Sequence, residues 1–135
     1  MASFSLTDAF VLINAANMSG MFTKLTLKVS AAELDNTAFG MTWHSRIGGL
    51  KDYELDVSFN QDFAAAQVDA LIWPLFGTVV TFEARPTSAA RAVTNPAFTG
   101  SILISDYTPL DGSVGDLAGS SFVWKGAAAL LRQTS

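Results

Sequence analysis

The sequence contains no cysteine and a single histidine, His44, in 135 residues. The absence of cysteine excludes disulfide bonds, thiol nucleophiles and cysteine-based zinc sites. With no second histidine, the usual transition-metal sites cannot be assembled, and we expect no metal and no cofactor. No serine lies in a nucleophile-elbow pattern, and Gly48 and Gly49 lack the spacing of a phosphate-binding loop. We therefore expect that the protein is not an enzyme and that His44 lies on the surface or in an interface.

Charged residues are scarce as well. They make up 15% of the chain, and the net charge is -4 with a pI near 4.6. This composition excludes the basic surface of a protein that grips nucleic-acid phosphates. No lysine or arginine precedes Lys24, so the start of the sequence lacks the basic flank of a secretory signal, and no apolar run is long enough to span a bilayer. Half of the residues are hydrophobic, which indicates that part of the surface contacts other protein chains.

Residues 51–60 alternate between apolar and polar side chains, which is the period of a half-buried strand. The apolar face holds Tyr53, Leu55, Val57 and Phe59, and the polar face holds Asp52, Glu54, Asp56, Ser58 and Asn60. The carboxylates form a flat row, which neither wraps around a calcium ion nor flanks a bond for acid/base catalysis. We interpret the row as a solvated acidic surface.

A second strand is predicted over residues 22–29. Leu25, Leu27 and Val29 share one face, and Lys24 and Lys28 lie on the other. Antiparallel pairing with residues 51–60 would place these lysines across from the carboxylates, and we predict that pairing.

Residues 30–49 have no sustained period and are predicted to be a long inter-strand loop. The loop nevertheless carries Phe39, Met41 and Trp43, which are large apolar side chains that disordered segments lack. We therefore expect the loop to pack against another surface.

One helix is predicted after the acidic strand. Asp62 is its expected N-cap, and Ala64, Val68, Leu71 and Leu75 form an apolar stripe. Pro74 and Gly77 are expected to end it. Trp73 points away from the stripe, so it either widens the core-facing side of the helix or anchors a subunit interface.

The remaining segments complete a single domain that spans residues 1–135. Residues 1–8 are predicted to be a flexible arm, and strands are predicted over residues 10–14, 78–85 and 98–105, with a closing pair at 122–125 and 127–132 around a turn or bulge at Gly126. Residues 127–131 could instead form a short helix. The sum is an α+β domain, mainly β, built on antiparallel sheets with one helix.

Several short stretches occur in an order that resembles the tail tube proteins, or major tail proteins, of long-tailed bacteriophages. They are DNTAFG at 35–40, GLKDYEL at 49–55, VDAL at 68–71, NPAFTG at 95–100 with the strand that runs to Tyr107 and Pro109, and GDL at 115–117. The likeness extends from about residue 10 to residue 132. Over these residues we expect no appended surface domain.

The resemblance implies two antiparallel sheets, arranged as a sandwich or partial barrel and flanked by one α-helix. It also implies self-assembly into hexameric rings that stack into a hollow, helical tube for DNA passage. Expected partners are other copies of the chain, the tape measure protein, and the tail terminator and tail tip proteins. The expected location is the virion tail, after assembly in the cytoplasm of the bacterial host, with no membrane insertion and no specific binding of the DNA that passes.

The resemblance also assigns roles to two sets of residues. The loop over residues 30–49 would contact neighbouring subunits or rings through Asp35, Thr37, Phe39, Met41, Trp43, His44 and Arg46. The row Asp52, Glu54 and Asp56 would face the lumen, where its charge would repel DNA phosphates. Two alternatives stay open: a monomeric β-sandwich binding or fibre module, and a tube subunit of a type VI-like secretion system.

Overall fold

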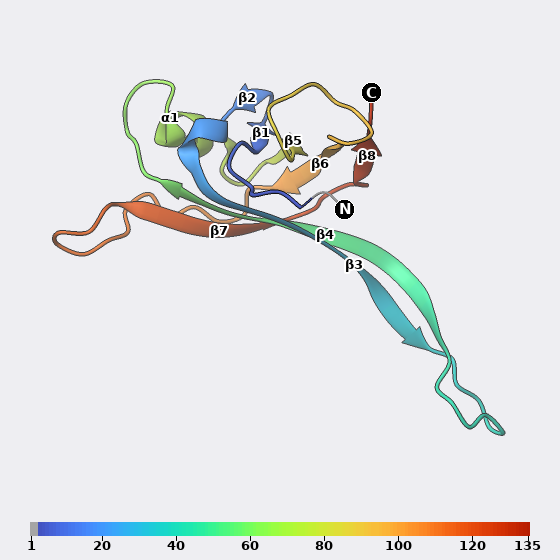
Figure 1. Ribbon diagram of the computed structural model, residues 1–135. Helices are drawn as coiled ribbons and strands as arrows, with labels where there is room; N and C mark the ends of the chain where they lie inside the picture. The colour runs from blue at the N-terminus through green and yellow to red at the C-terminus, as the bar shows by residue number, and fades with distance from the viewer. Residues whose placement is uncertain (1–2) are drawn as a thin grey trace.

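The computed structural model describes residues 3–135, which form two antiparallel sheets around one core (Figure 1). The five-stranded sheet has the order β2-β1-β5-β6-β8, with β1 Phe10–Ile13, β2 Ala16–Asn17, β5 Val79–Arg85, β6 Ala97–Leu103 and β8 Leu131–Gln133. The three-stranded sheet has the order β3-β4-β7, with β3 Phe22–Asp35, β4 Arg46–Asn60 and β7 Gly119–Lys125. The helical segments are α1 Val68–Ile72 and the 3-10 turns η1 Ser19–Met21 and η2 Trp73–Leu75. The predicted mainly β fold with two antiparallel sheets and one α-helix is confirmed.

The core is built from alternating residues of both sheets. The apolar face predicted for β4 is buried throughout, and the largest fully buried side chains include Trp124 of β7 and Phe59 of β4. Each such side chain contributes about 1.5–3 kcal/mol by leaving water. The indole nitrogen of Trp124 also donates a hydrogen bond to the carbonyl oxygen of Asp106 at 3.0 Å, so the burial leaves that polar group satisfied.

The predicted pairing of the lysine strand with the carboxylate strand is confirmed. β3 and β4 are antiparallel, with Leu25 opposite Val57 and Lys28 opposite Glu54. The predicted loop over residues 30–49 is wrong in extent, because β3 continues to Asp35 and β4 begins at Arg46. Beyond residue 29 both faces of the hairpin meet solvent, so nothing in the pattern marks one face as buried. Backbone pairing alone forms the strands there.

The helix is shorter than predicted and begins later. Its N-cap is Gln67, and the Asp62 carboxylate instead accepts a hydrogen bond from the Ala64 amide at 2.9 Å, six residues before α1. This local turn competes with helix formation, and Ala66 adopts a positive φ of 61°. Val68 and Ile72 are the buried residues of α1, and Gly77, with φ of 81°, follows η2.

The predicted closing pair of strands is also wrong, because β7 and β8 lie in different sheets. β7 pairs with β4, whereas β8 pairs with β6. Gly126 is the point where the chain leaves one sheet for the other, and its amide donates to the carbonyl oxygen of Tyr53 at 2.8 Å. A Cβ at Gly126 would lie 2.4 Å from the Tyr53 ring, so glycine is required for this close passage.

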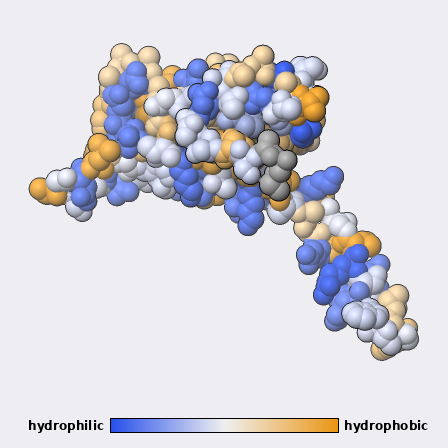
Figure 2. All heavy atoms as spheres, viewed as in Figure 1, coloured by the Kyte–Doolittle hydropathy of each residue, from blue (hydrophilic) through white to orange (hydrophobic). Residues whose placement is uncertain are grey.

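The molecule has a compact body and one long projection (Figures 1 and 2). The projection is the distal part of the β3–β4 hairpin, and we call residues 30–51 the hairpin arm. Of the predicted amino-terminal arm, residues 1–2 lie outside the described part, and residues 3–8 form no helix or strand. Within the described chain, no helix combines the length and the apolar character that crossing a membrane requires.

Candidate assembly interfaces

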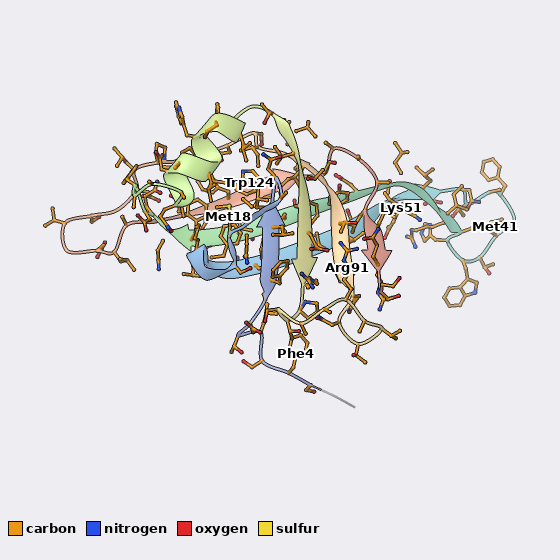
Figure 3. All side chains as sticks on the ribbon, turned by 90° about the horizontal axis from the view of Figure 1, so that it is seen from above. Phe4, Met18, Met41, Lys51, Arg91 and Trp124 are labelled. Atoms are coloured by element: carbon orange, nitrogen blue, oxygen red, sulfur yellow. The ribbon has the colours of Figure 1, made fainter. Side chains whose placement is uncertain are left out.

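The hairpin arm presents large apolar side chains to solvent. Leu34, Phe39, Met41, Trp43, Ile47 and Leu50 are all exposed, and no residue of the arm is buried. Figure 3 places Met41 at the far tip, well away from the core residues Met18 and Trp124. Monomeric proteins rarely expose so much apolar surface on one projection, which marks the arm as a contact surface.

The tip of the arm is ordered by its own polar contacts. The Asp35 carboxylate accepts a hydrogen bond from the Thr37 amide at 2.9 Å, and the Thr37 hydroxyl accepts one from the Ser45 amide at 2.8 Å. Hydrogen bonds from Thr37 hold the pKa of Asp35 below its usual value. The His44 Nδ1 lies 3.5 Å from a carboxylate oxygen of Asp35, and Arg46 opposes Asp35 in the strand register.

The residues predicted for the interface loop therefore all lie on the hairpin arm, but they divide into two kinds. Asp35, Thr37, His44 and Arg46 lie where the strands end and the tip begins. Phe39, Met41 and Trp43 lie at the tip with their side chains exposed. The polar group fixes the shape that presents the apolar group.

The predicted acidic row lies on the outer face of the three-stranded sheet, opposite the core, but lysines share that face. We call this surface the charged face; it contains Lys24, Lys28, Asp52, Glu54, Asp56 and Lys125. The Lys24 ammonium lies 3.1 Å from the Asp56 carboxylate. Three carboxylates and three ammonium groups cancel, so the face is neutral overall although the row along β4 is acidic.

Both sheets end in strands with a free edge in the described part of the chain. In the three-stranded sheet these are β3 and β7, and in the five-stranded sheet they are β2 and β8. β3 is 14 residues long, so it offers an extended row of unpaired backbone groups. Such an edge is a template for pairing with another chain.

A second apolar surface lies beside α1. Trp73 is exposed and its ring stacks on Phe76 at a centroid distance of 6.3 Å, with Phe63 also exposed. Core packing of Trp73 is thereby excluded, and the role of an interface anchor stays a prediction. Leu110, Val114 and Leu117 are further exposed apolar residues on the loop before β7. Sequence reasoning missed them, although apolar residues in a loop rich in glycine and aspartate were a usable signal.

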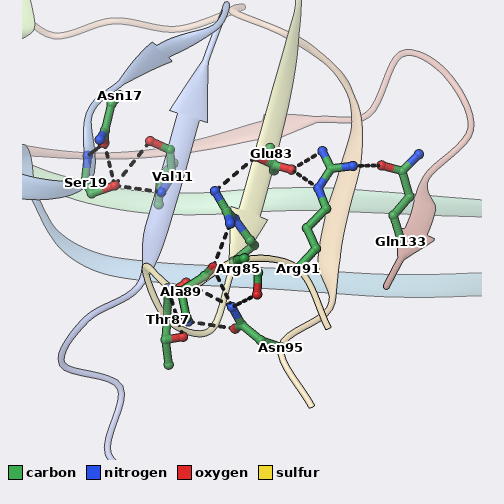
Figure 4. A network of polar contacts seen from close by, with 11 residues as sticks. Val11, Asn17, Ser19, Glu83, Arg85, Thr87, Ala89, Arg91, Asn95 and Gln133 are labelled. Atoms are coloured by element: carbon green, nitrogen blue, oxygen red, sulfur yellow. Dashed lines mark hydrogen bonds and ion pairs between the residues drawn. The ribbon is translucent and has the colours of Figure 1, made fainter. Parts of the chain in front are cut away.

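A buried ion cluster holds residues 86–96 over the outer face of the five-stranded sheet (Figure 4). The Glu83 carboxylate, which is buried, accepts hydrogen bonds from Arg91 and lies 3.7 Å from the Arg85 guanidinium. Arg91 also donates to the Gln133 side chain at 2.7 Å, and Arg85 lies over the Phe10 ring at 3.9 Å. The cluster therefore connects β1, β5 and β8, and we assign it a structural role.

The amino-terminal segment is attached to the same loop. The Asp8 carboxylate accepts a hydrogen bond from the Ser88 hydroxyl at 2.6 Å, and this contact holds the pKa of Asp8 below its usual value.

Among residues 3–135, no three histidine, aspartate or glutamate side chains lie close enough together to hold a metal ion. The candidate functional features of the described residues are therefore exposed apolar surfaces, free strand edges and the hairpin arm.

Comparison with known proteins shows a likeness in fold to solved structures. No family model matches the chain, and no curated protein matches it. The fold is similar to that of a chain in the structure of the virion of a native gene transfer agent particle, with a TM-score of 0.76 and 16% sequence identity. The alignment covers 97% of this chain and 99% of that chain. The chain thus shares its fold, along nearly its whole length, with a protein of a virion.

Proposed function

We propose that this protein is a structural component of a virion and, more specifically, a tail tube subunit that assembles into stacked rings around a channel for DNA. The virion role is supported by the fold shared with a chain of a gene transfer agent particle. The tube role is supported by the order of sequence stretches that resembles major tail proteins.

The hairpin arm is the observation that carries the proposal. Its strands extend beyond any contact that the body offers, and its tip exposes Phe39, Met41 and Trp43. Ordering such a projection costs backbone entropy, and the arm buries no side chain of its own to offset that cost. A neighbouring subunit or ring that covers the apolar tip accounts for both the length and the composition.

The free edges of β3 and β7 would supply the ring contacts. If β3 of one subunit pairs with β7 of the next, the three-stranded sheets join into one continuous barrel and their exposed edges disappear. The charged face, with Asp52, Glu54 and Asp56, would then line the channel. Six copies in a closed ring is the symmetry that the family resemblance implies.

The proposal includes no catalytic step. Self-association supplies the main contacts, and the tape measure, tail terminator and tail tip proteins are the proposed partners at the lumen and the two ends. The proposed location is the tail of the virion, reached after assembly in the host cytoplasm.

Electron microscopy of the purified protein at rising concentration tests the proposal directly. Rings or tubes are expected for the natural chain. A variant with Phe39, Met41 and Trp43 each changed to serine should keep its circular dichroism spectrum and fail to stack, because the arm loses its apolar contacts. Val93→Ser, which alters an exposed residue outside the arm, is the matched control and should still assemble. A natural chain that stays monomeric at high concentration, or an arm variant that assembles normally, contradicts the proposal.

A further inference from the structure

We propose that the charged face is a latent binding surface for double-stranded DNA, kept inactive because its lysines are neutralised by carboxylates of the neighbouring strand. The inference rests on the proposed function, since that function brings DNA close to this face. It assigns the row Asp52, Glu54 and Asp56 a role other than direct repulsion of DNA phosphates. The carboxylates would prevent adhesion because Asp56 pairs with Lys24 and Glu54 lies between Lys28 and Lys125 in the strand register.

The strand register places one carboxylate between two lysines. Glu54 of β4 lies directly opposite Lys28 of β3 on one side and directly opposite Lys125 of β7 on the other. Directly opposite residues of antiparallel strands have Cβ atoms about 4.5–5.5 Å apart, so both ammonium groups can reach the Glu54 carboxylate.

The second pair, Lys24 and Asp56, is diagonal in the strand register and forms an ion pair. The Lys24 ammonium lies 3.1 Å from the Asp56 carboxylate, although Lys24 opposes Ser58 in the register. The Lys24 side chain therefore leans along the strand toward the carboxylate. Asp52, one step further along β4, extends the negative row next to Lys28.

The charged face has no net charge, but its charges are not evenly distributed: the carboxylates lie on β4 and the lysines lie on the two flanking strands. Without Glu54 and Asp56, two lysines on β3 and one on β7, on either side of β4, would remain against the single carboxylate of Asp52. Neighbouring strands are about 4.8 Å apart, so Lys28 and Lys125 would lie about 10 Å apart across β4. That spacing allows both to contact phosphates of one duplex, with release of counterions as the driving force.

The ion pair between Lys24 and Asp56 is expected to contribute little to the stability of the fold. The side chains of Lys24 and Asp56 are 55% and 30% exposed, and ion pairs at such sites stabilise proteins only weakly. Replacing the carboxylates should thus leave the fold intact while it changes what the face attracts.

The test compares two variants that carry the same change in net charge. Glu54→Gln with Asp56→Asn removes the neutralising groups, and Asp111→Asn with Asp116→Asn removes two exposed carboxylates on the loop before β7. Binding of a fluorescent DNA duplex to the free subunit is measured by anisotropy over a range of salt concentrations. We expect the first variant to bind at least about tenfold more tightly than the second at low salt, with a slope of log affinity against log salt near -3, one for each lysine freed.

Adding Lys28→Gln and Lys125→Gln to the first variant should return binding to the level of the natural chain. Equal binding by the two carboxylate variants, or binding that survives removal of the lysines, overturns the inference. The readout uses the free subunit, so it is independent of whether the natural chain forms rings or tubes. A failure of the proposed function in electron microscopy is thereby distinguished from a failure here.

Discussion

The phenolic oxygen of Tyr53 lies 2.7 Å from the carbonyl oxygen of Ser101, to which it donates a hydrogen bond, and 3.1 Å from the Ser101 amide, from which it accepts one. Tyr53 belongs to β4 and Ser101 to β6, so a single side chain joins the two sheets through the core. The side chain also lies against Gly100 and Gly126, where a Cβ would approach the Tyr53 hydroxyl oxygen to 2.6 Å and the Tyr53 ring to 2.4 Å, respectively. This contact region adds a polar connection to the apolar core between the two sheets.

Tyr53→Phe should destabilise the protein by about 1–3 kcal/mol, because the Ser101 amide loses the hydroxyl oxygen that accepts its hydrogen bond. Urea unfolding followed by circular dichroism measures the change. Ser58→Ala, which removes an exposed hydroxyl bonded to Ser121, is the control and should change stability far less. Equal effects of the two substitutions would mean that the bridge between the sheets contributes nothing.

Gly126→Ala should destabilise the protein by about 1–3 kcal/mol or more, because the added methyl group overlaps the Tyr53 ring. Thermal unfolding measures this effect. Gly48→Ala is a matched control on the hairpin arm, where a Cβ would meet no atom within 4 Å. An unchanged melting temperature for Gly126→Ala would show that the chain crosses between the sheets with more room than the structure gives it.

Alkaline pH should destabilise the protein through Tyr107. Burial, together with the hydrogen bond that Tyr107 donates to Asp69 at 2.7 Å, raises the pKa of this phenol above its ordinary value of 10.0. A raised folded-state pKa means that the neutral phenol favours folding. Its contribution is complete below pH 10 and is lost as the pH rises through the folded-state pKa.

Urea unfolding of the natural chain and Tyr107→Phe, from neutral pH to above the pKa of a free phenol, tests this expectation. The difference in unfolding free energy between the two proteins should shrink as the pH rises. A difference that stays constant over this range would show that Tyr107 does not ionise with unfolding.

Glu83→Gln should destabilise the protein by about 3 kcal/mol, because it leaves the guanidinium groups of Arg85 and Arg91 without the buried carboxylate that neutralises them. Asp56→Asn removes the carboxylate of an exposed pair and should cost less than about 1 kcal/mol. Chemical unfolding of both variants measures the contrast. Similar costs at the two sites would argue against a stabilising role for the Glu83 cluster.

The elements that the sequence predicts correctly are those with one face in the core. Tyr53, Leu55, Val57 and Phe59 alternate because burial selects every second residue of β4, and the lysines of β3 follow the same period. The distal hairpin has no buried face, so its strands leave no period to detect. The start of α1 was misplaced because Asp62 forms a local turn instead of a cap.

The candidate surfaces were predicted only in part. The acidic row on β4 was visible in the sequence, but the lysine on its second side was not, since Lys125 lies opposite Glu54 only because β7 pairs with β4. That pairing joins segments about seventy residues apart and depends on the route by which the chain passes from β6 of one sheet to β7 of the other. Local patterns carry no information on such a route.

The three tryptophans occupy three different environments. Trp124 is fully buried, Trp73 is exposed beside α1, and Trp43 at the tip of the hairpin arm is 85% exposed. Indole fluorescence shifts to shorter wavelength when water is removed from around the ring. Trp124 therefore gives a constant background, and in a Trp73→Phe variant the emission of Trp43 would report, in real time and without a label, the moment at which the arm contacts its partner.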